Sequence, residues 1–147
     1  MEQWLKTLRK SRLIAWVTLA FFIMQPITLA AVVIVDPSNP EVQVQTVNGV
    51  DVVNIANPTG NGLSHNKYTD FNVGPNGLIL NNGRTNSNTE LAGMINANAN
   101  LTGNSARIIL NEVTSQNISH LNGMIEVGGQ RADVVIANAN GIVGSGF

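Results

Sequence analysis

The feature that most constrains this chain is a strand that ends in an Asn-rich turn close to the C-terminal end. The apolar run Asp133–Ala137 leads directly into Asn138-Ala139-Asn140-Gly141-Ile142. A similar turn, Asn98-Ala99-Asn100-Leu101, stands 40 positions earlier. Strand–turn units that recur without long helices between them are typical of β-solenoids, in which stacked coils share one core.

The composition supplies many tight corners for such coils. The 147 residues include 21 Asn and 14 Gly, and both residue types tolerate the backbone conformations that turns require. Val, Ile and Leu recur in blocks along the whole chain, which argues against a disordered, low-complexity protein. Cysteine is absent, so neither a disulfide nor a thiolate site can form.

Short strands are expected between these corners. The alternating run Val42–Val47, the turn Asn48-Gly49 and the returning run Val50–Ile55 predict a β-hairpin. We expect this hairpin to cover the open edge of the first coil as an N-terminal cap. Further strands are expected at 68–73, 78–80, 106–113, 124–127 and 133–137, and a short helix only at Asn88–Ile95.

These elements predict an all-β fold, a right-handed parallel β-helix with an N-terminal β-hairpin cap. Strands this short cannot bury a core singly, whereas stacked coils can enclose one, with Asn residues stacked in ladders at the corners. The alternative is a β-sandwich. A sandwich requires a cleaner polar–apolar alternation than Ile108-Ile109-Leu110 provides.

Residues 1–31 have the organisation of a secretory signal peptide. A basic start between Lys6 and Arg12 precedes the apolar run Leu13–Met24, and small residues follow. We expect cleavage after Ala30 or Ala31, which leaves 32–147 as the mature domain.

The alternative is an uncleaved anchor in the inner membrane, because Leu13–Val35 is long enough to span a bilayer. Pro26 in the middle of this run favours the cleaved signal. Without the segment the chain keeps four basic and eight acidic residues, a net charge of −4. Nucleic-acid binding requires a basic surface, so no nucleic-acid partner is expected.

Candidate catalytic groups are sparse. Ser64-His65 and Ser119-His120 place serine beside histidine, but neighbours on a strand point to opposite faces. An enzyme acting on polysaccharide would require a charged cluster on one outward face. The residues available for that cluster are Asp70, Glu112, Glu126, Asp133, Arg107 and Arg131. Their spacing matches no metal-binding pattern, so we expect neither an enzyme nor a metal or cofactor.

Several sequence blocks resemble one known family. Asn57–Val73 resembles the opening block of the two-partner secretion (TPS) domain, also called the haemagglutination activity domain. Leu91–Ile95, Ser105–Val113 and Leu121–Val127 resemble its later blocks, in the order of the family. Such domains begin filamentous haemagglutinins, haemolysins and contact-dependent inhibition toxins of Gram-negative bacteria. The resemblance covers nearly all of residues 32–147.

The resemblance assigns two secretion motifs, Asn-Pro-Asn-Leu and Asn-Pro-Asn-Gly-Ile. The first falls on Asn98, Ala99, Asn100 and Leu101, and the second falls on Asn138, Ala139, Asn140, Gly141 and Ile142. Both prolines are alanine here. Proline presets φ at the second position of a type I turn, so its loss should cost about 0.4–1 kcal/mol, mainly through a freer unfolded chain.

The resemblance also implies a function and a route. A TPS domain is a secretion signal that crosses the inner membrane through the general secretory translocon. In the periplasm it is recognised by the POTRA domains of an outer-membrane TpsB-type transporter, which exports the exoprotein to the cell surface or the medium. The two Asn turns are expected either to contact the transporter or to hold the corners of the coils.

The given sequence stops at Phe147, whereas the resemblance implies a domain that continues for further coils, so we expect either a fragment or a truncated reading frame without the adhesive, haemolytic or nuclease region. We therefore expect a partial TPS domain whose β-helix is truncated at the C-terminus, with an exposed edge on its last coil.

Overall fold

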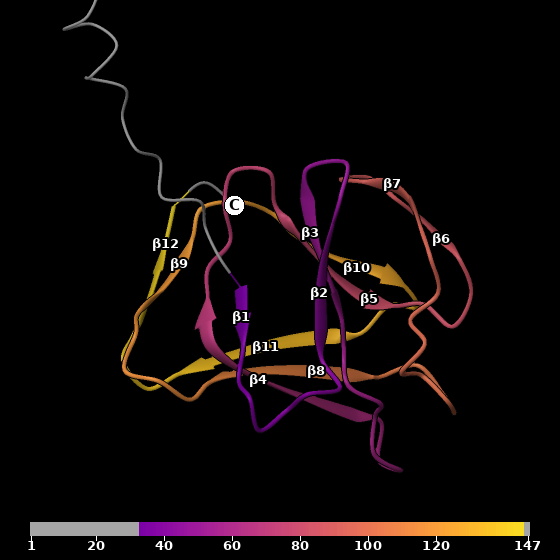
Figure 1. Ribbon diagram of the computed structural model, residues 1–147, viewed down its shortest axis with the longest axis horizontal. Coiled ribbons are helices and arrows are strands. Elements are labelled where there is room, and N and C mark those ends of the chain that lie inside the picture. Colours follow the sequence, from indigo (N-terminus) through magenta and orange to yellow (C-terminus); the bar gives the residue numbers. More distant parts are fainter. Residues whose placement is uncertain (1–32, 146–147) are drawn as a thin grey trace, which may run out of the picture.

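The computed structural model describes residues 33–145 (Figure 1). The predicted signal peptide, including Ala30 and Ala31, lies outside the described residues. Every regular element from 33 to 145 is a β-strand, and this range offers no helix of the length and apolarity that membrane crossing would need.

The strands are short, and most of them end at an Asn or Gly corner. They are β1 (Val33–Val35), β2 (Gln43–Val47), β3 (Val50–Asn54), β4 (Leu63–Phe71), β5 (Leu78–Asn82), β6 (Ser87–Thr89), β7 (Gly93–Ile95), β8 (Ile108–Val113), β9 (Ser119–Leu121), β10 (Ile125–Gly129), β11 (Asp133–Asn138) and β12 (Ile142–Gly144).

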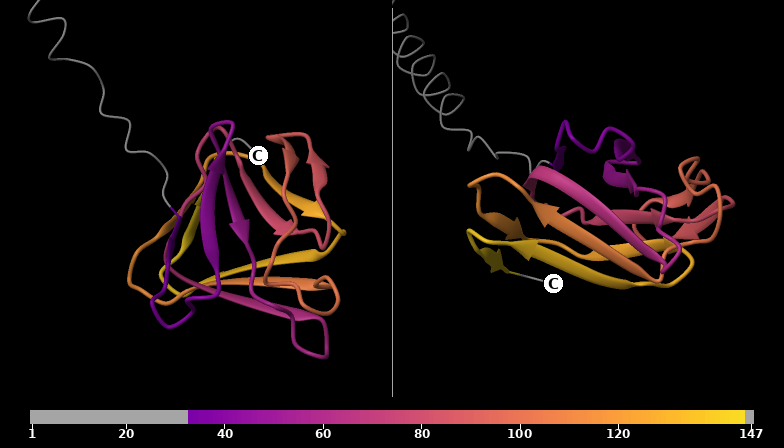
Figure 2. Two further views of the ribbon diagram at one scale, coloured as in Figure 1. Left: turned by 45° about the vertical axis from the view of Figure 1, so that its right-hand side comes forward. Right: turned by 90° about the horizontal axis from the view of Figure 1, so that it is seen from below.

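Three sheets surround a common core (Figure 2). Sheet A contains β1, β4, β8 and β11, and sheet B contains β2, β3, β5 and β10. Sheet C contains β9 and β12, and Val73 of the first coil adds a parallel bridge to Leu121 at the end of β9. Successive coils pair in parallel in all three sheets, as β4–β8–β11, β3–β5–β10 and β9–β12. The predicted parallel β-helix is therefore confirmed, because a sandwich would pair its strands antiparallel.

Two antiparallel strands cap the first coil. β2 returns into β3 through Asn48-Gly49, whose φ angles of +50° and +81° are those of a type I′ hairpin turn. β1 pairs antiparallel with β4 and covers the corresponding edge of sheet A. Hydrogen bonds from Thr114 and Ser38 lower the pKa of the Asp36 carboxyl to about 2, and the Thr114 bond ties the cap to the end of β8.

The core combines apolar side chains with a buried polar row. Asn66 on β4 and Asn111 on β8 are in register and fully buried. Asn66 Nδ2 donates to the Leu110 carbonyl at 3.2 Å, and Asn111 Nδ2 donates to the Val135 carbonyl at 3.3 Å. Tyr68 donates its hydroxyl to Asn111 Oδ1 at 3.1 Å, and burial raises the pKa of this phenol. Each Asn thus links its own coil to the next.

The helix expected at Asn88–Ile95 is wrong, because this segment forms the antiparallel hairpin β6–β7 outside the coil. Gly93 has a φ of +72°, which a helix does not accommodate. Ala92 and Ile95 are buried against Val52 and Ile79 on the outer face of sheet B. In so short a segment the local helical pattern is weak, and contact with this apolar face determines the conformation instead.

β4 begins at Leu63, five residues before the expected start at Tyr68. The prediction missed this part because its inward-facing side chains, Ser64 and Asn66, are polar. β11 lies at the edge of sheet A, where Val134 and Val135 are 37% and 44% exposed.

One close approach between coils gives a test of this packing. A Cβ added at Gly123 would lie 2.0 Å from the carbonyl oxygen of Gly74 in the preceding coil, whereas one at Gly103 would meet nothing within 4 Å. We expect Gly123→Ala to lower the free energy of unfolding by about 1–3 kcal/mol or more. Gly103→Ala should change it by no more than about 0.5 kcal/mol. Urea unfolding followed by circular dichroism measures both, and equal losses would contradict the packing described.

Candidate functional site

The two Asn turns lie at different corners of the β-helix (Figure 1). Asn98–Leu101 follows β7 and lies where sheet B leads into sheet A, whereas Asn138–Ile142 connects β11 in sheet A to β12 in sheet C. Registered residues of sheet A are 45 positions apart from Leu63 to Ile108 and 25 positions apart from Ile108 to Asp133, so no coil repeats at 40 positions in this sheet. The interpretation of these turns as one recurring corner is therefore wrong, because the first precedes β8 of sheet A and the second follows β11 of sheet A.

The local geometry of the two turns is nevertheless the same. The Asn100 amide donates to Asn98 Oδ1 at 3.0 Å, and the Asn140 amide donates to Asn138 Oδ1 at 2.9 Å. The Leu101 amide donates to the Asn98 carbonyl at 3.2 Å, and the Gly141 amide donates to the Asn138 carbonyl at 3.3 Å. The first Asn of each motif thus closes its own turn with both its side chain and its backbone.

The first motif is built into the interior. Asn98 is 2% exposed, and its Nδ2 donates to the carbonyls of Ile55 at 2.9 Å and Asn81 at 3.0 Å. Asn100 Nδ2 donates to the Glu41 carbonyl at 2.7 Å, and Leu101 belongs to the main core. This motif therefore joins the cap, the first coil and the second coil.

The second motif makes equivalent contacts nearer the surface. Asn138 Nδ2 donates to the Asn117 carbonyl and to Ser119 Oγ, both at 2.9 Å, and Asn140 Nδ2 donates to the Ser115 carbonyl at 2.8 Å. Asn140 and Gly141 are exposed, and Ile142 is 43% exposed. The Asn residues of both motifs therefore hold the corners of the coils by hydrogen bonds. Contact with a transporter stays a prediction.

The positions that carry alanine in place of proline face solvent. Ala99 and Ala139 are both exposed, and within residues 33–145 neither of their backbone amides donates a hydrogen bond. A proline at either position would therefore remove no bond from the fold.

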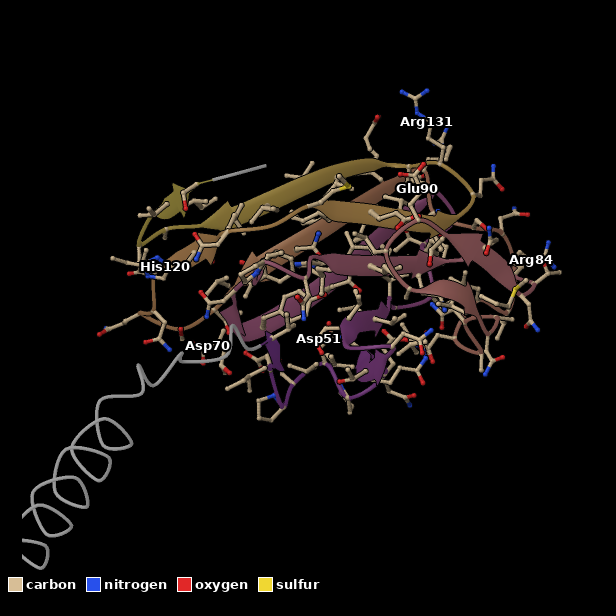
Figure 3. The ribbon with its side chains drawn as sticks, turned by 90° about the horizontal axis from the view of Figure 1, so that it is seen from above. Asp51, Asp70, Arg84, Glu90, His120 and Arg131 are labelled. Atoms are coloured by element: carbon tan, nitrogen blue, oxygen red, sulfur yellow. The ribbon has the colours of Figure 1, made fainter. Side chains whose placement is uncertain are left out.

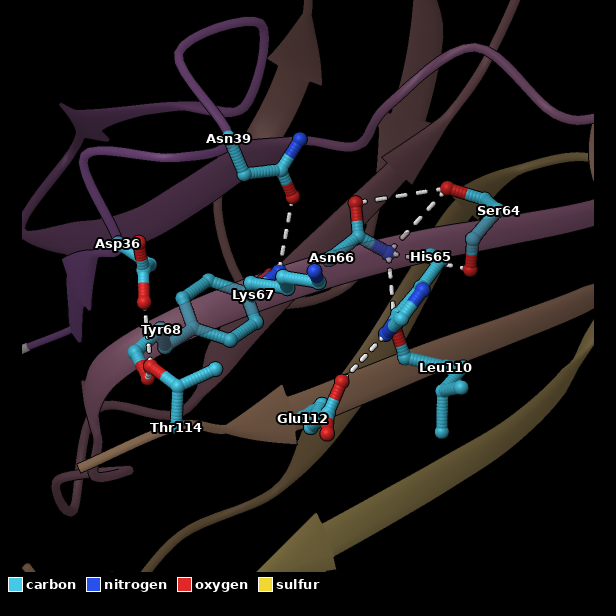
Figure 4. Close-up of polar contacts among 10 residues, drawn as sticks. All are labelled: Asp36, Asn39, Ser64, His65, Asn66, Lys67, Tyr68, Leu110, Glu112 and Thr114. Carbon is cyan, nitrogen blue, oxygen red and sulfur yellow. Dashed lines mark hydrogen bonds and ion pairs between the residues drawn. The ribbon is translucent and has the colours of Figure 1, made fainter. Parts of the chain in front are cut away.

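The serine–histidine pairs are not brought together. Ser64 and Ser119 are fully buried, whereas His65 and His120 face outward, as the strand geometry predicts. His65 Nε2 lies 2.6 Å from Glu112 Oε2 on the neighbouring strand (Figure 4). Ser64 Oγ instead donates to the Ala56 carbonyl at 2.7 Å.

The charged residues considered for polysaccharide chemistry lie on several elements, and Figure 3 shows two of them, Asp70 and Arg131, toward opposite ends of the molecule. Glu112 lies on sheet A, whereas Glu126 lies on sheet B and accepts the backbone amides of Glu90 and Leu91 at 2.9 and 3.0 Å. Asp70 accepts from Asn117 Nδ2 at 2.8 Å. The remaining three lie nearer to one another. Arg107 and Arg131 are on connections from sheet B to sheet A, and the amide of Asp133, at the start of β11, donates to the Arg107 carbonyl at 2.9 Å. Within residues 33–145 no three His, Asp or Glu side chains come close enough to hold a metal ion.

Asn82 is a structural asparagine whose role the sequence did not predict. Asn82 is fully buried, accepts the Ala106 amide at 2.7 Å, and donates to the carbonyls of Ala106 and Gln130 at 2.9 and 2.8 Å. It therefore joins the corners of the second and third coils. Its sequence signal, Asn81-Asn82-Gly83 after an apolar strand, indicated only a turn.

These contacts define the class of fold: a capped parallel β-helix whose corners are held by asparagine side chains. The particular family follows from the sequence, because the profile of the TPS secretion domain matches residues 31–146. The chain belongs to this family. The predicted family and function, a secretion domain of the kind found in haemagglutinin, haemolysin and CdiA exoproteins, are thereby confirmed.

Individual relatives support the same assignment. The chain is 45% identical over 140 residues to the tRNA nuclease CdiA of Escherichia coli O6:K15:H31, a match that covers 92% of this chain and 4% of the relative. It is 46% identical over 118 residues to the hemolysin of Proteus mirabilis, covering 78% of this chain and 8% of the relative. The chain thus spans a small part of these proteins.

A solved structure agrees with the computed fold. The crystal structure of a filamentous hemagglutinin secretion domain superposes with a TM-score of 0.71 at 43% sequence identity, covering 78% of this chain and 37% of that chain. At this identity the likeness supports the family as well as the fold.

The two motifs predict different losses of stability. Asn98→Ala removes the bonds to the carbonyls of Ile55 and Asn81 and the acceptor of the Asn100 amide at a buried site. The Ile55 carbonyl keeps its bond from Asn100 Nδ2 at 3.1 Å. We expect the variant to lower the free energy of unfolding by about 2–4 kcal/mol. Asn140→Ala removes bonds that water can replace, and we expect a loss of no more than about 1 kcal/mol. Urea unfolding of the two variants measures the difference, and equal losses would contradict the contrast in burial.

Proposed function

We propose that this chain is the secretion signal of a larger exoprotein and that it is recognised by an outer-membrane TpsB-type transporter. The observation that carries the proposal is the match of the TPS secretion domain over residues 31–146. The parent protein is an adhesin, a haemolysin or a contact-dependent inhibition toxin, as the names of the relatives suggest.

The proposed route has two membrane steps. Residues 1–31 direct the chain to the general secretory translocon and are cleaved after Ala30 or Ala31, and the family match that begins at residue 31 supports this boundary. The domain then meets the POTRA domains of the transporter in the periplasm. Export places the parent protein at the surface of a Gram-negative cell or in the medium.

The two motifs play different roles in this function. Asn98 is enclosed and acts through the fold, whereas Asn140, Gly141 and Ile142 are exposed beside Ala139 and can contact a partner directly. We therefore assign direct contact with the POTRA domains to the second motif. Loss of secretion on substitution of Asn98 then reflects a destabilised domain.

Dependence on the transporter is the decisive test. The full chain is expressed in a Gram-negative host with and without a TpsB-type transporter from a related two-partner system. We expect the chain to appear outside the cell only when the transporter is present, and to remain in the periplasm otherwise. Export that is equal without the transporter would overturn the proposal, and a periplasmic marker protein controls for lysis.

Restoring proline tests the role of the altered motif positions. Ala99→Pro and Ala139→Pro should each raise the free energy of unfolding by about 0.4–1 kcal/mol, because proline restricts the unfolded chain at a site whose amide makes no bond. Ala137→Pro is the control. It lies inside β11 and should destabilise the domain, because proline fits poorly within a paired strand. Thermal and urea unfolding measure all three, and destabilisation by Ala139→Pro would contradict the turn geometry.

A further inference from the structure

The connections from sheet B to sheet A form a polar hollow beside the first motif. Two Gly-containing loops, 58–62 of the first coil and 103–107 of the second, enclose a volume of about 280 Å³. The amides of Arg107 and Ile108 donate to the Gly62 carbonyl at 2.8 and 3.1 Å, and the Thr102 amide donates to Asn57 Oδ1 at 3.2 Å. The walls are thus held by hydrogen bonds between successive coils.

The guanidinium group of Arg107 is held in a defined place at this hollow. One of its terminal nitrogens donates to the Asn61 carbonyl at 2.7 Å. Its side chain crosses Gly62, where an added Cβ would lie only 2.8 Å from Arg107 Nε. Gly62 has a φ of +79°, so glycine is required at this position for both conformation and space. The group carries five N–H donors, and the carbonyl of Asn61 uses one of them.

Within residues 33–145 the Arg107 guanidinium forms no ion pair, although Asp133 adjoins the backbone of Arg107 through its amide, which donates to the Arg107 carbonyl at 2.9 Å. The ion pair within residues 33–145 joins His65 to Glu112, on the outer face of sheet A. The polar side chains that line the hollow are neutral apart from Arg107, namely Thr59, Asn104 and Ser105. The site therefore offers an oriented cation and uncharged donors, but no negative charge.

The same side of the domain carries most of its positive charge. Of the four basic residues in 33–145, three lie on connections from sheet B to sheet A: Arg84, Arg107 and Arg131. All three are exposed, and Figure 3 shows Arg84 and Arg131 toward one end of the molecule together with the acidic Glu90, with Asp70 and His120 toward the other. Because the lining of the hollow carries the charge of Arg107 and no acidic side chain, a carboxylate partner would be attracted to the hollow itself.

We propose that the hollow at Arg107 binds the carboxylate of an Asp or Glu side chain from a protein partner, and that an acidic segment of the transporter's periplasmic part supplies it. The identity of the partner rests on the proposed function. The volume is slightly below that of typical small-molecule pockets, which suits a single side chain. A planar guanidinium with free donors suits a two-point contact with a carboxylate.

The test compares charge variants of the full chain for export and for binding to the purified periplasmic part of a TpsB-type transporter. We expect Arg107→Glu to weaken binding about tenfold and Arg107→Lys to weaken it less, because lysine keeps the charge but loses the planar fork. Arg84→Glu makes the same charge change away from the hollow and should alter binding less than about twofold. Raising the salt concentration should weaken binding of the unsubstituted chain more than binding of Arg107→Glu.

The outcomes separate the two proposals. Export that depends on the transporter but is unaffected by Arg107→Glu would overturn the carboxylate site and leave the secretion function standing. Equal losses for Arg84→Glu and Arg107→Glu would also overturn it, because net charge alone would explain them. Arg107→Gln retains donors for the Asn61 carbonyl and, with a melting curve, shows whether a loss reflects misfolding.

A direct probe needs no transporter. The isotope-labelled full chain is titrated with hexaglutamate and, as the control, with hexalysine. We expect amide chemical shifts to move at 59–62 and 103–107 with hexaglutamate only. Shifts confined to other regions, or the same shifts with hexalysine, would overturn the proposal.

Discussion

The hydrogen bond from an asparagine side-chain amide to a backbone carbonyl of another coil is the interaction on which this structure depends. Strands of three to nine residues leave many corner carbonyls that no ladder satisfies, and a buried carbonyl without a donor costs stability. Asn82, Asn98 and Asn111 each supply such donors from positions with almost no solvent exposure. The asparagine content of the chain is therefore a structural requirement of its many corners, as well as a source of turns.

Apolar packing is divided between the inside and the outside of the coil. The main cluster fills the interior, around Tyr68, Phe71 and Ile109, whereas a second cluster lies on the outer face of sheet B beneath the β6–β7 hairpin. The carboxylate of Glu126 on β10 accepts two amides of that hairpin. The hairpin is thus fixed by residues of an earlier and a later coil, so its final position requires that the third coil has formed.

The sequence predicted the elements whose signals are local. Asn48-Gly49 between two alternating runs specifies its hairpin, and the apolar runs at Leu78 and Ile108 specify strands. The errors arose where distant contacts decide. Asn88–Ile95 is too short to hold a helix against the apolar face of sheet B, and the early part of β4 is polar because Asn66 bonds across coils. The motif residues followed from family resemblance, whereas the hollow at Arg107 depends on two loops more than 40 positions apart and has no local signal.

The first motif and the Arg107 hollow are parts of one corner, and this affects how secretion defects are interpreted. The segment that runs from Asn98 to Arg107 is bound at both ends to the first coil, through the Ile55 and Gly62 carbonyls. Displacing Asn98 would therefore also move the loop 103–107 that carries the guanidinium. A secretion defect at Asn98 reports on stability and on this surface together, whereas substitution of Arg107, which is exposed, leaves the amide network in place. The second motif lies at another corner. If the double variant at Arg107 and Asn140 loses as much free energy of transporter binding as the two single variants together, the two sites make independent contacts.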